Sequence, residues 1–176
     1  MFPSAKPDGQ QTHACGIRYG VQGEKHWSGQ ETNRTNDVYD AKADAIAALE
    51  AAGAPTGNLQ TARDASGHYH PGRSAVLKLG KNVLAQFGEI HPAILNDMGI
   101  KANVVGFEVF LDNIPASKKK GTAKSLLKLS AFQPLNRDFA FIVDENVEVE
   151  TITRAAIGAE RNLITNVNVF DVYQGK

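Results

Sequence analysis

The stretch RSAVLKLGKNVLAQFGEI, residues 73–90, constrains the fold more than any other part of the chain. Hydrophobic residues alternate with others on both sides of Gly80-Lys81-Asn82: Leu77 and Leu79 precede this turn, and Val83, Ala85 and Phe87 follow it. Successive residues of a strand point to opposite faces, so the alternation predicts two antiparallel strands joined by a tight turn. The chain is therefore expected to be built, at least in part, on an antiparallel sheet.

The rest of the first two thirds of the chain supplies further strands and helices. Residues 12–21 read as a strand, residues 58–64 can form a short strand, and residues 102–114, rich in β-branched and aromatic residues, predict another. Residues 37–55 change to helical spacing, with Asp37 or Asp40 as the cap and Gly53 and Pro55 as the stop; the apolar positions are Ala41, Ala45, Ala48, Leu49 and Ala52. A short helix is expected after Pro92.

A basic stretch separates this part from the last third. Residues 113–137 contain no acidic residue, whereas cations gather there: Lys118, Lys119, Lys120, Lys124, Lys128 and Arg137. A change of amino-acid composition of this kind is typical of a domain boundary. Lysine runs are usually solvated linkers, but this one could also contact the phosphates of tRNA or another polyanion.

The last third predicts a single β-α-β unit. Residues 137–145 and 166–175 have strand character, and residues 147–164 have helical spacing with Ile152, Ala156 and Leu163 on one face. A unit of this size cannot cover both faces of two strands, so we expect it to belong to a larger sheet and the chain to be a fragment. Exposed strand edges would invite pairing with a second copy as a homodimer, through Phe139, Phe141, Val169, Val172 and Tyr173.

Composition narrows the function classes. The 176 residues are 42% hydrophobic, enough for a core, and 19 basic residues balance 19 acidic ones, so attraction to a polyanion must be local. The one cysteine, Cys15, lies in an apolar run and is expected to be a buried, inert thiol. No apolar stretch is long enough for a membrane span and no signal peptide is recognisable, which predicts a cytoplasmic protein without membrane contact.

Three histidines have side chains that could bind a metal ion. His68 and His70 would share a face of a strand, and His91 could complete a zinc site. No HExxH, CxxC or acidic cluster accompanies them, so hydrogen-bonded turn histidines are the favoured interpretation and no metal is expected. A serine triad of Ser74, His70 and Asp64 lacks the G-x-S-x-G elbow. No catalytic residue is predicted.

The segment HPGRSA, residues 70–75, reads as a structural turn. Pro71 fixes its backbone and Gly72 permits the reversal, while His70 precedes them. Arg73 could bind a phosphate, but no glycine-rich loop leads into a helix here. We expect instead a buried ion pair from Arg73 to one of two carboxylates, Glu89 or Glu108.

Taken in order, these signals resemble one family. HPGRSA, the hairpin, FGEIHP, FEVFLD, the basic stretch, FQPLNRDFAFIVDE, a helix and VFDVYQGK together resemble the C-terminal part of the bacterial phenylalanyl-tRNA synthetase beta subunit. The resemblance runs from about DGQQTHACGIRYG to the last residue. The strand at residues 104–110 is nearly all apolar, as expected of a strand that packs rather than one that catalyses.

The resemblance implies an α+β fold in three parts. Residues 1–115 would be a catalytic-like scaffold, an antiparallel sheet with flanking helices that is class II synthetase-like but inactive. Residues 116–129 would be the basic linker. Residues 130–176 would be a partial ferredoxin-like β-α-β unit, the first half of the anticodon-binding domain.

The resemblance also implies a function. The whole enzyme would be an α2β2 heterotetramer that uses ATP and magnesium to attach phenylalanine to its tRNA, with the chemistry in the alpha subunit. This fragment would hold no cofactor and would supply subunit contacts and tRNA binding, with Lys118, Lys119, Lys120 and Arg137 as the candidate tRNA contacts. The alternative is a free-standing nucleic-acid-binding or adaptor protein without ligase activity.

Overall fold

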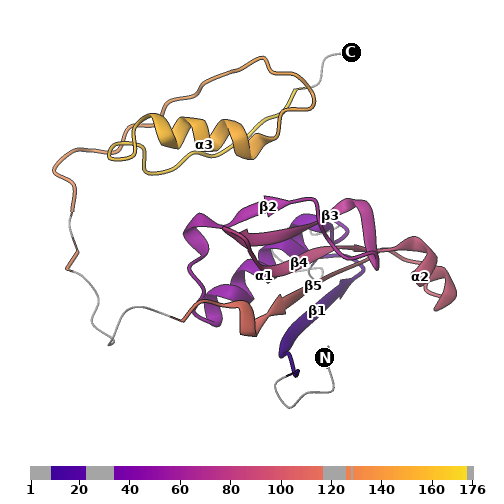
Figure 1. The fold of residues 1–176 in the computed structure, drawn as a ribbon. Coiled ribbons are helices and arrows are strands. Elements are labelled where there is room, and N and C mark those ends of the chain that lie inside the picture. The colour runs from indigo at the N-terminus through magenta and orange to yellow at the C-terminus, as the bar shows by residue number, and fades with distance from the viewer. Residues whose placement is uncertain (1–8, 23–33, 117–125, 128, 174–176) are drawn as a thin grey trace, which may run out of the picture. The chain divides into compact units, whose positions relative to one another are not determined.

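The computed structural model describes residues 9–22, 34–116, 126–127 and 129–173 (Figure 1). The chain divides into two compact units, Met1–Thr122 and Ala123–Lys176. The division falls inside the basic stretch recognised in the sequence. Each unit is described on its own below.

The first unit is built on a five-stranded antiparallel sheet. The strands are β1 (His13–Tyr19), β2 (Gln60–Ala62), β3 (Tyr69–Leu79), β4 (Asn82–Ile90) and β5 (Val104–Phe110), in the spatial order β1-β5-β4-β3-β2. The predicted hairpin is confirmed: β3 pairs with β4, and Gly80 turns the chain with a φ of 62°. That positive φ suits glycine, because it has no Cβ.

The helix α1 (Val38–Ala51) covers one face of this sheet, as Figure 1 shows. Asp37 caps it by accepting hydrogen bonds from the backbone N–H groups of Tyr39 and Asp40, and the Asp40 side chain accepts from the N–H of Asp37 in return. This capping box satisfies donors that the first helical turn leaves free. The predicted apolar stripe is buried against the sheet through Ala41, Ala45 and Leu49.

The core lies between α1 and the sheet. Apolar side chains of the strands meet the helix there: Ala75, Leu77, Leu84, Ala85, Phe87, Val105 and Val109. The short helix α2 (Pro92–Asp97) follows β4, with Pro92 as its first residue and His91 as its cap. Single 3-10 turns occupy Thr56–Asn58 and Leu111–Asn113.

The second unit departs from the sequence prediction. Its helix α3 (Val149–Ala159) is present, with Ile152 and Ala156 half-buried, but it ends before Leu163, which is 77% exposed. The predicted strands at 137–145 and 166–175 are wrong for the residues described, which form no ladder there. A strand is stabilised by hydrogen bonds to a neighbouring strand, and within residues 126–173 these two stretches have none.

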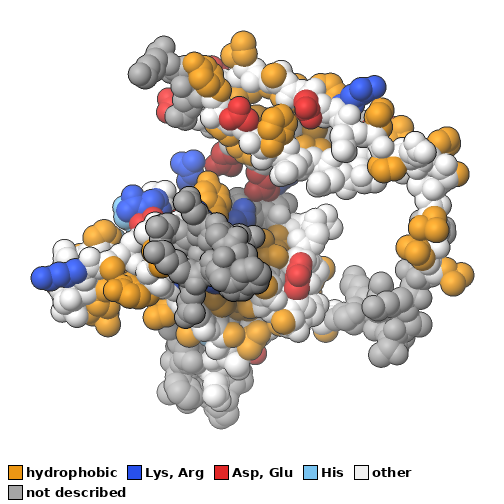
Figure 2. Space-filling model, turned by 180° about the vertical axis from the view of Figure 1, so that it is seen from behind, with side chains coloured by type: hydrophobic (Ala, Val, Ile, Leu, Met, Phe, Trp, Pro, Cys, Tyr) orange, Lys and Arg blue, Asp and Glu red, His pale blue; other side chains and the backbone are white. Residues whose placement is uncertain are grey.

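Because the described residues of 137–145 and 166–175 form no strand pairs, their large apolar side chains are exposed to solvent. Phe139 and Phe141 stack with ring centroids 6.3 Å apart, yet both are exposed. Orange hydrophobic side chains stand out along this unit in Figure 2. The exposed residues of the two stretches include Phe139, Phe141, Ile142, Val143, Val169, Phe170, Val172 and Tyr173.

Candidate interaction face of the sheet

The sheet of the first unit has a second face that no described helix covers. Side chains alternate along each strand, so the residues between those that contact α1 point to the opposite side. We call this side the open face. Its members on the four longer strands are His13, Cys15, Ile17, Tyr19, Ser74, Val76, Gln86, Gly88, Ile90, Val104, Gly106, Glu108 and Phe110.

The strand register sets a polar row across the open face. Gln86 is paired with Val76 on one side and with Glu108 on the other, and Glu108 is paired with Cys15. Gln86 is only 5% exposed, but both polar atoms of its amide form hydrogen bonds. Its Oε1 accepts hydrogen bonds from Ser66 N, at 3.1 Å, and from Ser66 Oγ, at 2.8 Å, while its Nε2 donates to Glu108 Oε2. These bonds orient the amide and place the Glu108 carboxylate.

A glycine pair lies beside the polar row. Gly88 and Gly106 are directly opposite each other in β4 and β5. A Cβ on Gly88 would lie 2.4 Å from Ser74 Cβ, and a Cβ on Gly106 would lie 3.1 Å from the carbonyl oxygen of Gly16 and 3.2 Å from Ile17 Cγ2. Neighbouring strands therefore close over both positions, and only glycine fits without a shift.

Tyr69 is the most buried tyrosine near this face. It is 3% exposed and, as the first residue of β3, pairs with Ile90 at the end of β4. Its hydroxyl makes no hydrogen bond within the described residues. Burial raises the pKa of this phenol, and the charges of Glu108 and Cys15 raise it further. The hydroxyl is therefore neutral at physiological pH and remains a hydrogen-bond donor.

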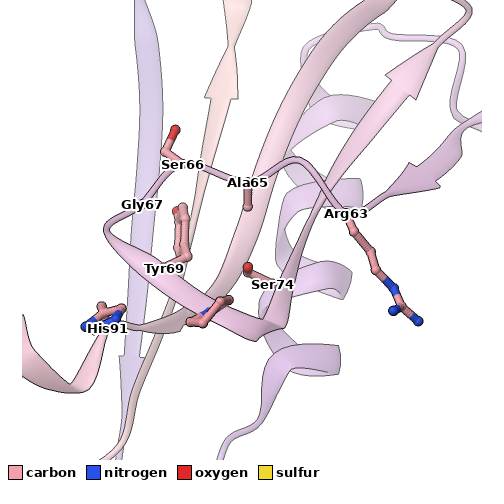
Figure 3. A pocket seen from close by; sticks show the side chains of 8 residues that line it. Arg63, Ala65, Ser66, Gly67, Tyr69, Ser74 and His91 are labelled. Atoms are coloured by element: carbon pink, nitrogen blue, oxygen red, sulfur yellow. The ribbon is translucent and has the colours of Figure 1, made fainter.

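A hollow of about 410 Å³ lies next to the polar row, between the loop that precedes β3 and the strand itself (Figure 3). Its lining is Arg63, Ala65, Ser66, Gly67, Tyr69, Pro71, Ser74 and His91. Figure 3 shows Arg63 and His91 at opposite sides, with the Arg63 guanidinium pointing away from the other labelled residues. The polar groups do not converge on one point, as a catalytic constellation would require.

The residues of the HPGRSA turn are engaged in local contacts. The His70 Nδ1 accepts a hydrogen bond from Gly72 N at 3.0 Å, and the His70 carbonyl accepts one from Ser74 Oγ at 2.7 Å. Arg73 Nε lies 2.5 Å from Glu89 Oε2. Glu89 is almost fully buried, but the Arg73 side chain is half exposed, so the pair is at the border of the core. Glu108 takes no part in it and contacts Gln86 instead.

The residues considered for a serine triad and for a zinc site make other contacts. Asp64 pairs with Lys78 at 2.5 Å, not with His70. His68 packs its ring against Tyr69, and the His91 Nδ1 accepts a hydrogen bond from Ala93 N at 3.2 Å as the cap of α2. Within the described residues, no three histidine, cysteine or acidic side chains lie together as metal ligands would.

Of the four cations expected to contact tRNA, only one can be located in the structure. Lys118, Lys119 and Lys120 lie outside the described residues, whereas Arg137 is described and exposed.

The prediction that Cys15 is buried is wrong: its thiol is exposed. The reason is topological, because β1 is an edge strand and Cys15 points from it onto the open face. An apolar run predicts a strand, but it does not say whether the strand is central.

Sequence reasoning also missed the exposed apolar side chains of β1. Ile17 is 75% exposed and Tyr19 is 67% exposed, and both lie on the open face. Exposed apolar groups beside a sheet edge are typical of a contact surface. A pattern of every second residue in 13–19 could have signalled the face, but only the strand order shows that β1 lies at the edge of the sheet, where these side chains are exposed. In the described part of the chain, no helix is both long and apolar enough to cross a membrane.

The two units correspond to two known family models, which match the chain in the same order. Residues 3–111 match the phenylalanyl tRNA synthetase beta chain CLM domain, and residues 130–176 match the ferredoxin-fold anticodon binding domain. The chain belongs to the phenylalanyl-tRNA synthetase beta chain family.

Relatives support the same assignment over the whole chain. Phenylalanine–tRNA ligase beta subunits are 48% identical over 175 residues in Rhodospirillum rubrum, 48% over 182 residues in Bradyrhizobium diazoefficiens and 49% over 180 residues in Bartonella henselae. These matches cover 99%, 100% and 99% of this chain, and 22% of each relative. The chain thus spans about a fifth of the length of the curated relatives it matches.

Proposed function

We propose that this chain acts within the beta subunit of a phenylalanine–tRNA ligase, in the cytoplasm, and contributes subunit contacts and tRNA binding rather than chemistry. The observation that carries the proposal is the match of both modules, in order, to beta subunits along almost the whole chain. The enzyme would attach phenylalanine to its tRNA with ATP, as an α2β2 assembly. The first unit would be a class II synthetase-like scaffold that faces the alpha subunit.

The residues of the first unit support a binding role. Three of its arginines form structural ion pairs rather than pointing at a common ligand: Arg18 with Asp44, Arg34 with Asp37 and Asp40, and Arg73 with Glu89. The open face offers Glu108 beside a neutral amide, which does not fit a site for ATP and magnesium. ATP and magnesium would be held by another part of the enzyme.

The second unit would bind tRNA. The ferredoxin-fold anticodon binding model covers residues 130–176, and the cations Lys118, Lys119, Lys120 and Arg137 lie just before it or within it. We propose them as phosphate contacts. Such contacts weaken steeply as salt rises, because each neutralised phosphate releases counterions.

Two measurements on the purified chain test this function. Mixed with ATP and phenylalanine, the chain should form no burst of adenylate, and a burst would overturn the assignment of the chemistry to the alpha subunit. In gel filtration it should bind the tRNA for phenylalanine with specificity only when an alpha subunit is present. Specific binding of that tRNA by the chain alone would favour a free-standing nucleic-acid-binding protein instead.

We also propose that isolated copies associate through the second unit. Its exposed Phe139, Phe141, Val169, Val172 and Tyr173 form no strand ladder in the described residues. Unpaired extended segments of this kind tend to pair between chains. Light scattering should give a larger mass for the whole chain than for residues 1–129 after allowing for length, and two monomeric species would contradict it.

A further inference from the structure

Glu108 differs from the other partly buried carboxylates of the first unit. Asp40, Asp44 and Glu89 each face an arginine, at 2.6 Å from Arg34 Nη2, 2.5 Å from Arg18 Nε and 2.5 Å from Arg73 Nε. Glu108 is half-buried on the open face, and in the described part of the chain its partner is the neutral amide of Gln86. A carboxylate removed from water is usually stabilised by a cation, so this one lacks its usual complement.

The carboxylate is held ready for such a cation. Ser66 donates twice to Gln86 Oε1, and this leaves Gln86 Nε2 to donate to Glu108. The amide is almost fully buried and cannot turn without losing these bonds. A fixed acceptor costs a partner little ordering on binding. The Tyr69 hydroxyl, without a hydrogen bond in the described residues, lies near enough for the Glu108 charge to raise the pKa of this phenol.

The surroundings of Glu108 suit a protein surface rather than a pocket. Glu108 is not among the residues that line the hollow of about 410 Å³. In the adjoining row Ser74 and Ile17 close over Gly88 and Gly106, and Ile17 and Tyr19 on β1 are largely exposed. A half-buried carboxylate beside exposed apolar side chains suits a protein contact, in which a charge fixes the register of the partner.

We propose that the open face docks a protein partner through a lysine or arginine side chain whose cationic group binds Glu108 while its stem packs against Ile17, the diagonal neighbour of Glu108 on β1. Charge complementarity identifies the occupant: the face presents a fixed, half-buried carboxylate, and no described cation pairs with it. A metal ion needs several ligands, whereas one carboxylate suits a single guanidinium or ammonium. The inference concerns the partner's chemistry and does not depend on the proposed function.

The test is a titration of the whole 15N-labelled chain with n-butylguanidinium, followed by NMR. Signals of the Gln86 side-chain amide and of residues 15–19 and 106–108 should shift saturably, with a Kd of about millimolar, because a free probe makes only one ion pair. Glu108→Gln keeps the shape and the hydrogen bond from Gln86, and it should weaken binding about tenfold or more. Asp97→Asn removes an exposed carboxylate on α2 and should change nothing.

Other results would overturn the inference. Absence of any shift in the wild type, or equal shifts in Glu108→Gln, would remove Glu108 as the anchor. Equal binding of neutral n-butanamide would mean apolar docking without a cation. Binding of the free probe at micromolar concentration would identify a small-molecule site instead of a protein contact. If Glu108→Gln fails to fold, wild-type binding that does not weaken with added salt would count against the ion pair.

Discussion

Gly88 of β4 and Gly106 of β5 face each other across the sheet, and neighbouring atoms fill the space where each side chain would be. Gly88→Ala would place a methyl group 2.4 Å from Ser74 Cβ, so a strand has to shift. We expect the free energy of unfolding of the first unit to fall by about 1 to 3 kcal/mol. Gly57→Ala is the control, because nothing lies within 4 Å of its Cβ position. Urea unfolding with equal midpoints for the two variants would contradict the packing described.

The ion pair of Arg73 and Glu89 gives a second prediction. Arg73→Met leaves the almost fully buried Glu89 carboxylate without its cation, which should destabilise the first unit by about 1 to 3 kcal/mol. Lys78→Met breaks the pair with Asp64, whose side chain is mostly exposed, and should cost about 0 to 1 kcal/mol. Thermal unfolding ranks the two variants. A larger loss for Lys78→Met would show that Arg73 does not stabilise a buried charge.

The cap of α1 predicts a dependence of stability on pH. Arg34 holds the pKa of the Asp40 carboxyl below its usual value, mainly by a hydrogen bond, and the Asp37 backbone adds to this. Because the pKa is lower in the folded state than in the unfolded state, this stabilisation is fully present above the unfolded pKa and is lost as pH falls through the folded pKa. Denaturant unfolding between about pH 6 and about pH 3 should show a steeper loss for the wild type than for Asp40→Asn. Parallel curves would argue against the linkage.

The exposed thiol of Cys15 gives a direct chemical check of the open face. Because Cys15 points outward from an edge strand, the native chain should react with a maleimide at one site without denaturant. Mass spectrometry gives the count, and Cys15→Ser supplies the unreactive control. Labelling that requires unfolding would mean that the face is covered in solution.

Local patterns in the sequence predicted the first unit well. Alternation on both sides of Gly80 identified the hairpin of β3 and β4, and helical spacing with Asp37 as cap identified α1, because each signal lies within a few consecutive residues. The sequence does not decide between Glu89 and Glu108 as the neighbour of Arg73, since that choice depends on the strand register. Register is a property of two strands together.

The predictions that are wrong also depend on how strands pair with one another. The strands expected at 137–145 and 166–175 need neighbours that the described residues do not supply, and a run of β-forming residues cannot state whether they are present. Cys15, Ile17 and Tyr19 are exposed because β1 lies at the edge of the sheet, which only the strand order shows. The polar row of Gln86 and Glu108 also joins residues distant in sequence.

The most direct test of the account places this chain in a relative. The Rhodospirillum rubrum beta subunit, 48% identical over 175 residues, would have its matching segment replaced by this chain and be co-expressed with its alpha subunit. The measurement is the attachment of phenylalanine to its tRNA by the purified complex. A role in subunit contacts and tRNA binding predicts an assembled, active chimera with the Km for tRNA changed by less than about tenfold, or about 1.4 kcal/mol. A folded chimera that does not associate with the alpha subunit, or that associates but does not charge tRNA, would contradict it.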